Sequence, residues 1–177
     1  MLERVLRDTA KNGTLDCVVL RYFNVAGARP DLKTGQTSKF ASHLIKIACE
    51  VAIGKRESIS IFGEDYPTPD GSCIRDYIHV QDLVEAHLCA YDYLAKNSGF
   101  EVFNLGYGHG YSVKQVLAEF ERANSLTIQK KSAPRRAGDP SQIVSNPQKA
   151  MKILGWKPQF DSLDIICRSA FLWEKKI

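Results

Sequence analysis

The chain has 177 residues, which is enough for one domain with a core of its own but few for two. Hydrophobic residues make up 44% of it and charged residues 25%, the balance of a soluble globular protein. The 24 basic and 20 acidic residues leave a net charge of +4, and the basic residues do not gather into one run. This mild excess fits a pocket for an anionic small molecule at least as well as a nucleic-acid surface.

Signals for a membrane, for secretion and for disulfides are all weak. No apolar run approaches the roughly 20 residues that span a bilayer, and the charged helix pattern at 1–11 has no secretory apolar region. We therefore expect a cytoplasmic protein with no membrane partner. The five cysteines are odd in number, form no CxxC pair and lie in apolar neighbourhoods, which favours small buried residues over disulfides or a metal site.

Strands and helices alternate along the chain. A helix is predicted over 1–11, beginning without a preceding cap and ending at Asn12-Gly13, and the apolar run 17–23 is typical of a buried parallel strand. The small residues 24–28 then predict a loop, and loops at the carboxyl ends of such strands are candidate walls of a ligand site. The other predicted elements are helices over 39–53, 81–97, 113–124, 147–154 and 163–175, strands over 58–62, 73–80, 100–105 and 126–130, and loops over 29–38, 63–72 and 133–145.

Two local patterns lie around the fourth predicted helix. Ser112 is a good N-cap, and Gln115 at the third helical position completes a capping box. The preceding glycine-rich turn over 106–110 has the spacing GxGxG and lies deep in the chain, whereas a dinucleotide fingerprint needs GxGxxG directly after the first strand. We interpret it as a tight strand-to-helix turn that needs positive φ angles.

Arginines in unusual positions are the strongest signals for a binding site. Arg75 lies inside an otherwise apolar strand and needs an anionic partner, because an unpaired buried charge is very costly. Asp76 would point to the opposite face of a regular strand. Arg136 lies in a loop after a strand, three residues before Asp139. Arg75 and Arg136 could bind a diphosphate and Asp139 could bind ribose hydroxyls, while structural ion pairs are the alternative for each arginine.

Other chemistry is poorly represented in the sequence. No P-loop, zinc-ligand spacing, Gly-x-Ser-x-Gly turn or Cys/His arrangement is present, so we expect no catalytic residue and no metal ligand in this chain. The four histidines show no ligand pairing, and His79 before a helix start is interpreted as structural. Phe62 at a strand end could stack on a base or pack in the core, with the core as the default.

Several motifs together resemble those of the UDP-glucose 4-epimerase family, within the extended short-chain dehydrogenases. They are LRYFNVAGA at 20–28, IFGEDYPT at 61–68, DGSCIRDYIHV at 70–80, NLG at 104–106 with YSV at 111–113, and APRRAGDP at 133–140. The resemblance covers nearly the whole chain and identifies it as the carboxy-terminal half of such an enzyme. The chain departs from the family pattern at Lys46, where a proline is usual, and at Gln36, where a glutamate is usual.

The resemblance implies an α/β fold made of the last Rossmann elements and a small mixed α/β substrate-binding domain. It assigns residues 1–28 to a remnant of the NAD-binding Rossmann domain. Residues 29–177 are then mostly a UDP-sugar-binding domain, with a returning Rossmann strand and helix near 73–105. The implied reaction interconverts UDP-glucose and UDP-galactose in galactose metabolism, with NAD as the cofactor of the complete enzyme.

The resemblance also implies roles for individual residues. Tyr22 and Phe23 match positions beside the nicotinamide of bound NAD. Asn24, Arg75 and Arg136 match residues that bind the diphosphate. The remaining matches are His43 and Leu44 for nucleotide contacts, Ser60 and Phe62 around the uracil, Asp139 for the ribose, and Ile143 at a position near the hexose where family members vary in side-chain size.

In such enzymes a tyrosine of a YxxxK motif takes a proton from the sugar 4-hydroxyl while NAD takes the hydride. Neither YxxxK nor the GxxGxxG loop that binds the dinucleotide occurs in these residues, so we expect the chain to be inactive alone. Residues 2–6 resemble the helix just past the motif lysine. The expected partners are therefore UDP-glucose or UDP-galactose and a missing amino-terminal Rossmann half, with a homodimer as a further candidate and no nucleic acid.

Other functions stay open at this stage. The chain could be a non-catalytic module that binds UDP-sugars and folds on its own. It could also come from a related nucleotide-sugar decarboxylase or dehydratase, although the block at 65–80 argues against this. A nucleic-acid binder has only the mild basic charge in its favour.

Overall fold

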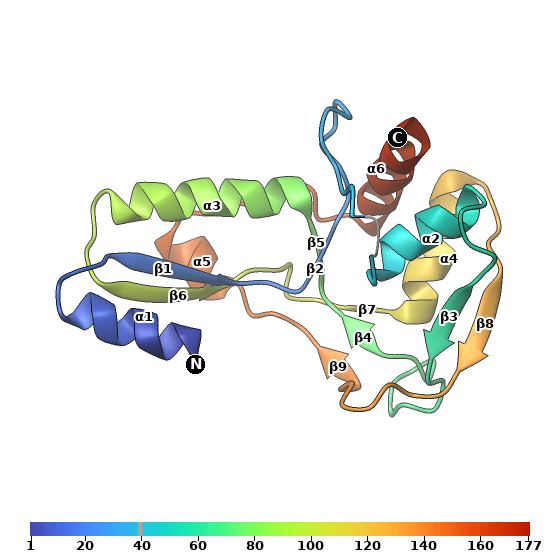
Figure 1. Ribbon diagram of the computed structural model, residues 1–177, viewed down its shortest axis with the longest axis horizontal. Helices are drawn as coiled ribbons and strands as arrows, with labels where there is room; N and C mark the ends of the chain where they lie inside the picture. The colour runs from blue at the N-terminus through green and yellow to red at the C-terminus, as the bar shows by residue number, and fades with distance from the viewer. Residues whose placement is uncertain (39–40) are drawn as a thin grey trace.

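Short paired strands lie along the length of the molecule, and helices are gathered at both of its ends (Figure 1). The computed structural model describes residues 1–38 and 41–177. Its elements are α1 (Leu2–Lys11), β1 (Cys17–Arg21), β2 (Asn24–Ala26), α2 (Leu44–Ala52), β3 (Ile59–Phe62), β4 (Ile74–Arg75), β5 (Tyr77–His79), α3 (Val80–Leu94), β6 (Phe100–Asn104), β7 (Tyr111–Ser112), α4 (Val113–Asn124), β8 (Lys130–Ala133), β9 (Gln142–Ile143), α5 (Gln148–Ile153) and α6 (Leu163–Lys176).

Most strand pairs are parallel and join segments that are distant in the sequence. β1 pairs with β6, β2 with β5 and β3 with β8, each in parallel. β4 lies between β7, to which it is antiparallel, and β9, to which it is parallel. Parallel strands joined through helices are the mark of an α/β fold of the Rossmann type.

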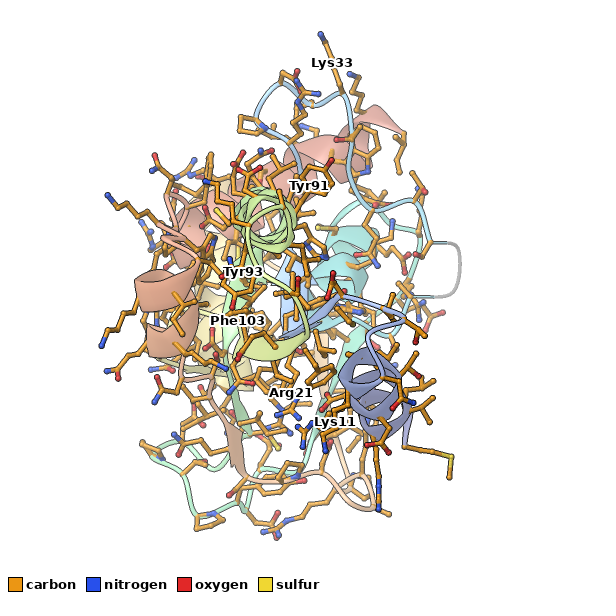
Figure 2. All side chains as sticks on the ribbon, turned by 90° about the vertical axis from the view of Figure 1, so that its left-hand side faces the viewer. Lys11, Arg21, Lys33, Tyr91, Tyr93 and Phe103 are labelled. Carbon is orange, nitrogen blue, oxygen red and sulfur yellow. The ribbon has the colours of Figure 1, made fainter. Side chains whose placement is uncertain are left out.

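One end of the molecule, which we call the β1–β6 end, consists of that strand pair with α1, α3 and α5. Figure 1 shows α1 and α3 on opposite sides of the two strands, and all three helices contact the pair. Tyr93 of α3 meets Phe103 of β6 edge to face, with ring centroids 5.9 Å apart, whereas Tyr91 on the same helix is 73% exposed (Figure 2). The helices therefore pack against these strands with one side and leave apolar residues on the other.

The opposite end, which we call the α2–α6 end, consists of α2, α4 and α6 with the β3–β8 pair. Its core consists of almost fully buried apolar side chains, which include Ile45, Ile59, Leu117, Phe120 and Ile166. The sequence starts α4 as predicted, since the Ser112 hydroxyl accepts from the Gln115 N–H and the Gln115 side chain accepts from the Ser112 N–H. This cap fixes where α4 begins and thus how it meets α2 and α6.

Several sequence expectations are confirmed to within a few residues. The predicted helices over 1–11, 81–97, 113–124, 147–154 and 163–175 correspond to α1, α3, α4, α5 and α6, and the strands over 58–62 and 100–105 correspond to β3 and β6. His79 is structural, because its ring nitrogen Nδ1 accepts from the Gln81 N–H and caps α3. Gly108 has a positive φ of 80°, as expected of the glycine-rich turn.

Other expectations were wrong, and pairing between distant segments explains most of them. The predicted strand over 17–23 ends at Arg21, and the predicted loop over 24–28 contains β2, which gains its strand conformation by pairing with β5. The predicted strand over 73–80 is divided at Asp76 into β4 and β5, and Val80 already belongs to α3. The predicted loop over 133–145 contains β9.

Two further elements have different bounds from those predicted. The helix expected over 39–53 begins at Leu44, with His43 in an extended conformation, while residues 39–40 lie outside the described part. The strand expected over 126–130 is displaced to β8, because the Ile128 N–H donates instead to the Glu121 carboxylate at 2.9 Å. In the described ranges no helix has the length and apolar character needed to cross a membrane, and the five cysteines are free.

Candidate functional site

A pocket of about 530 Å³ lies between the start of α2, strands β3 and β4, and the loop that follows β8. It has the size of sites that hold small molecules. Eight of the residues singled out from the sequence line it: Asn24, His43, Leu44, Ser60, Phe62, Arg75, Arg136 and Asp139. They come from five separate segments of the chain, so the fold brings together what the sequence separates.

Arg75 is held on the central strand of a three-stranded sheet, opposite Tyr111 on one side and Ile143 on the other. Its side chain is 14% exposed. Nη1 donates to the carbonyl oxygen of Ile74 at 2.8 Å, and Nη2 lies 3.6 Å from a carboxylate oxygen of Asp139. The expected anionic partner is thus present, but the pair is long, and the guanidinium keeps donors that a ligand could use.

Two adjacent arginines, Arg135 and Arg136, take different directions. The Arg136 guanidinium carbon lies 3.9 Å from the centre of the Phe62 ring, at the wall of the pocket. Arg135 instead forms an ion pair with Asp65 at 2.7 Å and lies over the ring of Tyr66. Only Arg136 of the two lines this pocket, where Phe62 is half-buried beneath it. The stacked guanidinium places a positive charge beside a flat aromatic surface.

Tyr77 lines the pocket and was not singled out from the sequence. It lies opposite Asn24 in the parallel β2–β5 register, and it precedes Ile78, which is 1% exposed. Burial raises the pKa of the Tyr77 hydroxyl, so this group remains protonated and can donate a hydrogen bond. Its position two residues after Arg75 was the available signal, since alternate residues of an extended segment share a face.

Arg56 and Ser58 are further pocket residues that sequence reasoning missed. They lie in the turn between α2 and β3, and Nε of Arg56 donates to the Glu50 carboxylate. A charged turn of this kind is normally a solvated surface, so the sequence contains no signal that would have placed either residue at a pocket.

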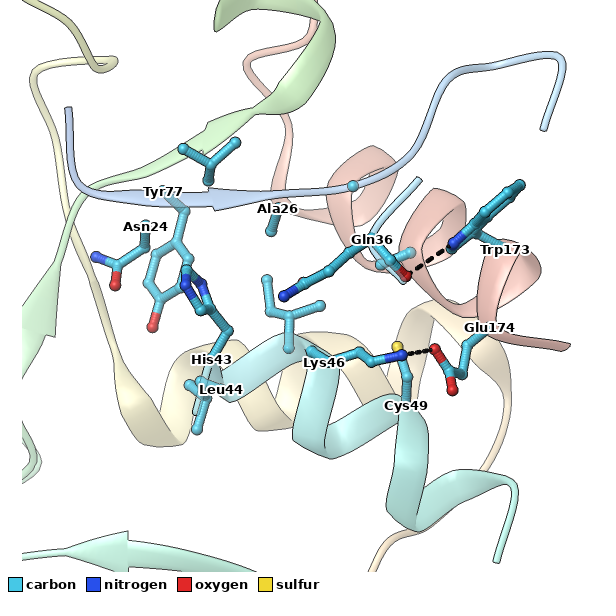
Figure 3. A pocket seen from close by; sticks show the side chains of 14 residues that line it. Asn24, Ala26, Gln36, His43, Leu44, Lys46, Cys49, Tyr77, Trp173 and Glu174 are labelled. Carbon is cyan, nitrogen blue, oxygen red and sulfur yellow. Dashed lines mark hydrogen bonds and ion pairs between the residues drawn. The ribbon is translucent and has the colours of Figure 1, made fainter. Parts of the chain in front are cut away.

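A second, much smaller cavity, whose lining is drawn in Figure 3, adjoins the first and shares Asn24, His43, Leu44 and Tyr77 with it. Its volume of about 20 Å³ is close to that of one water molecule. Its lining includes the buried ion pair between Lys46 and Glu174, which a dashed line marks in Figure 3. This cavity is too small for a ligand such as a sugar and instead separates the pocket from α6.

The two residues that depart from the family pattern, Lys46 and Gln36, both line that smaller cavity. Lys46 is 7% exposed and pairs with Glu174 of α6, and a second oxygen of Glu174 lies 3.0 Å from Nζ of Lys55. The carbonyl oxygen of Gln36 accepts from Nε1 of Trp173 at 2.9 Å. Lys46 and Gln36 thus both bind residues of α6, and neither of them lines the larger pocket.

Three of the singled-out residues do not line the larger pocket. Tyr22 and Phe23 connect β1 to β2 and are 43% and 41% exposed, and the Tyr22 ring meets His87 edge to face. Ile143 pairs with Arg75 across the sheet, and its carbonyl oxygen accepts from the Asp76 N–H at 3.1 Å. The roles assigned to these three residues by resemblance stay predictions.

The larger pocket does not have the lining of a dinucleotide site. It is lined neither by Tyr22 nor by Phe23, both of which are exposed, nor by a glycine-rich loop at a helix start, which a pyrophosphate needs. Within residues 1–38 and 41–177, no group of His, Cys, Asp and Glu is arranged to hold a metal ion. The chemistry available at the larger pocket is therefore the binding of an anion beside an aromatic wall.

Curated relatives and solved structures match this chain over nearly its whole length. It is 47% identical over 177 residues to a UDP-glucose 4-epimerase of Azospirillum brasilense and 43% identical over 173 residues to one of Streptococcus mutans. The crystal structure of the UDP-glucose 4-epimerase from Bifidobacterium longum in complex with NAD⁺ and UDP is similar, with a TM-score of 0.92 and 38% identity over 98% of this chain.

A structure from Stenotrophomonas maltophila, with bound NAD and formylated UDP-arabinopyranose, matches with a TM-score of 0.93 at 36% identity over 99% of this chain. The chain spans about half the length of these relatives, from 51% to 52%. The sequence model of the NAD dependent epimerase/dehydratase family matches residues 1–106, which is more than half of the chain. The chain therefore belongs to the NAD dependent epimerase/dehydratase family.

Proposed function

We propose that this chain is the UDP-sugar-binding half of a UDP-glucose 4-epimerase, and that the larger pocket holds the nucleotide. The observation that carries the proposal is the meeting of Arg75 and Arg136 at one pocket, from segments 61 positions apart in the numbering, beside the half-buried ring of Phe62. Two guanidinium groups next to an aromatic wall suit a nucleoside diphosphate. Relatives that bind UDP and a UDP-sugar support the same ligand class.

The pocket residues divide naturally between the parts of such a ligand. Arg75 and Arg136 would neutralise the diphosphate, with the Asn24 amide as a further donor. Asp139 is 3.6 Å from Arg75, a distance that allows its carboxylate to turn to ribose hydroxyls once phosphate oxygens occupy the guanidinium. Ser60 and Phe62 of β3 would flank the uracil. The distribution explains why charged and aromatic residues share one wall.

Calorimetric titration tests the proposed ligand. UDP is expected to bind, uridine to bind at least about tenfold more weakly because it lacks the charged groups that pair with arginine, and ADP to bind more weakly than UDP. Raising the salt concentration should weaken the binding of UDP more than the binding of uridine. Equal affinities for UDP and uridine would exclude the diphosphate site, and equal affinities for UDP and ADP would exclude recognition of the base.

We further infer that the chain corresponds to the carboxy-terminal half of its relatives. The 177 residues contain neither GxxGxxG nor YxxxK, and the pocket residues follow one another in the order of the family's substrate-binding motifs. Exposed apolar residues on α1 and α3, including Leu2 and Leu88, also suit helices that pack within a wider Rossmann sheet. Alignment against complete relatives tests this assignment, and a match confined to their amino-terminal halves would contradict it.

Because GxxGxxG and YxxxK do not occur in these residues, we expect no epimerase turnover by this chain alone. NAD would supply the hydride chemistry of the complete enzyme, and the residues of this chain would contribute binding and orientation of the UDP moiety. An assay that couples UDP-galactose to UDP-glucose formation should therefore give no activity above background with this polypeptide. Detectable turnover would refute the inactivity. The cytoplasmic location expected from the sequence stays a prediction.

A non-catalytic UDP-sugar-binding module is the second candidate. It is favoured by the eight residues that the fold brings together at the larger pocket and by the buried core among α2, α4 and α6 beside it. Addition of a separately produced amino-terminal half from a relative distinguishes the two candidates. Restored epimerase activity supports the enzyme half, while UDP binding that is unaffected and never accompanied by activity supports the module.

A further inference from the structure

Asp76 occupies the break between β4 and β5 and is 2% exposed. Its backbone joins two other elements, because its N–H donates to the carbonyl oxygen of Ile143 at 3.1 Å and its carbonyl oxygen accepts from Nδ2 of Asn24 at 3.0 Å. The residue before it is Arg75 and the residue after it is Tyr77, both of which line the larger pocket. Asp76 itself does not line that pocket.

The Asp76 carboxylate is bound entirely by backbone N–H groups. Oδ1 accepts from Tyr107 at 3.1 Å, and Oδ2 accepts from Gly108 at 3.1 Å and from Ser145 at 3.2 Å. Among the described residues no Lys, Arg or His forms an ion pair with it. Burial raises the pKa of the Asp76 carboxyl, and the three N–H donors act in the opposite direction by stabilising its charged form.

The glycine-rich turn is shaped to receive this carboxylate. A Cβ atom at Gly106 would lie 2.5 Å from Oδ2 of Asp76 and 2.6 Å from Cβ of Ser145, so a larger residue would collide with both. Gly108 has a φ of 80°, a conformation that directs its N–H at the carboxylate and that other residues rarely adopt. The glycine-rich turn therefore binds a carboxylate of the chain itself.

We propose that Asp76 is a positioning residue: its carboxylate anchors from behind the backbone that carries Arg75 and Tyr77 on the pocket wall, and its carbonyl oxygen holds the Asn24 side chain beside them. The proposal rests on the function proposed above. Alternate residues of an extended segment point to opposite faces, so Arg75 and Tyr77 face the pocket while Asp76 faces the turn. Without the anchor, β4 and β5 keep few backbone bonds, since β4 has two residues and β5 has three.

A purely structural role for Asp76 would give a different result, and Asp82 provides the matched control. Asp82 is 0% exposed and also accepts three hydrogen bonds, from the Tyr107 hydroxyl, the Gln159 N–H and the Phe160 N–H. It lies on α3 and is not a residue of the larger pocket. Both carboxylates hold loops in place, but only Asp76 is continuous with the pocket wall.

The experiment compares Asp76→Asn with Asp82→Asn by calorimetric titration with UDP, at a temperature where circular dichroism shows both variants folded. Asparagine retains one acceptor and turns an NH₂ group toward backbone donors, so each variant loses stability. We expect Asp76→Asn to weaken the affinity for UDP by about tenfold or more and Asp82→Asn to change it by less than about twofold. Similar changes in both variants would overturn the positioning role.

Two further measurements separate this inference from the proposed function. Combining Asp76→Asn with Arg75→Ala should weaken the binding of UDP by less than the two single changes together, because Asp76 acts in part through Arg75, and full additivity would contradict that action. Amide hydrogen exchange across 74–77 should be accelerated in Asp76→Asn and not in Asp82→Asn, without any ligand. If the wild-type chain fails to bind UDP, the proposed function falls while this exchange result still decides the positioning role.

Discussion

The two ends of the molecule bury their apolar residues to very different degrees. At the α2–α6 end, Phe120 and Leu117 of α4 are 0% and 1% exposed. At the β1–β6 end, Leu88 and Tyr91 of α3 are 54% and 73% exposed, and Figure 2 shows Tyr91 at the edge of that helix. The α2–α6 end therefore supplies a closed core to support the pocket, whereas the β1–β6 end presents apolar surface that a partner could cover.

The largest expected effect comes from truncating one aromatic ring at each end. Phe120→Ala should lower the free energy of unfolding by about 3–5 kcal/mol, because it leaves a cavity among α2, α4 and α6. Tyr91→Ala removes a ring that is mostly in solvent, so it should change the free energy of unfolding by less than about 0.5 kcal/mol. Urea unfolding measures both values, and comparable losses would contradict the difference between the ends.

The buried ion pair of the α2–α6 end provides the next effect. Glu174→Ala should lower the free energy of unfolding by about 3 kcal/mol, because it leaves the ammonium of Lys46 buried with only Glu50 nearby, at 3.8 Å. The double variant Lys46→Met/Glu174→Leu should recover most of that loss, since it removes the charges together. A double variant no more stable than Glu174→Ala would show that packing rather than unpaired charge is responsible.

The same pair gives this end a dependence on acid pH. Burial acts to raise the pKa of Glu174, but hydrogen bonds from Lys46 and Lys55 outweigh it and hold the pKa below its ordinary value of 4.5. Because the folded-state pKa is lowered, this stabilisation is present above 4.5 and is lost as the pH falls through the folded-state value. The stability difference between wild type and Glu174→Gln should shrink over that acid range, and a constant difference would contradict the assignment.

The smallest effect on stability is expected at the apolar surface of α3. Leu88→Lys should change the free energy of unfolding by less than about 0.5 kcal/mol, because the side chain packs against little of the protein. It should nevertheless reduce binding of a hydrophobic dye and self-association, which light scattering can measure. A large loss of stability would show that this residue is buried in solution by contacts with another copy.

Local signals in the sequence were sufficient for the start of α4 and for the anionic partner of Arg75. The capping box of Ser112 and Gln115 fixes α4 through hydrogen bonds within one turn, so the residue types alone predict it. Arg75 stood out because an arginine in an apolar strand needs an anion, and Asp139 lies 3.6 Å away. The roles of the individual pocket residues stay predictions, because no ligand contact has tested them.

The elements that were mispredicted depend on distant segments. Asn24 and Ala26 are of types that are depleted in strands, and residues 24–26 form β2 because β5 lies beside them. Leu126 and Ile128 have a strand-like pattern, but their N–H groups are bound by Glu121, at the carbonyl oxygen and the carboxylate respectively. That segment thus completes the end of α4, and its strand begins only at Lys130, opposite Ile59. Neither outcome can be derived from the neighbouring residues alone.

The central claim is that the larger pocket binds a nucleoside diphosphate through Arg136 and Arg75. Its most direct test is calorimetric titration of UDP into Arg136→Ala and into Arg135→Ala, because the two arginines are adjacent and only Arg136 lines the pocket, whereas Arg135 pairs with Asp65. We expect Arg136→Ala to weaken the affinity for UDP by about tenfold or more and Arg135→Ala to change this affinity by less than about twofold. Equal affinities in the two variants would contradict the account.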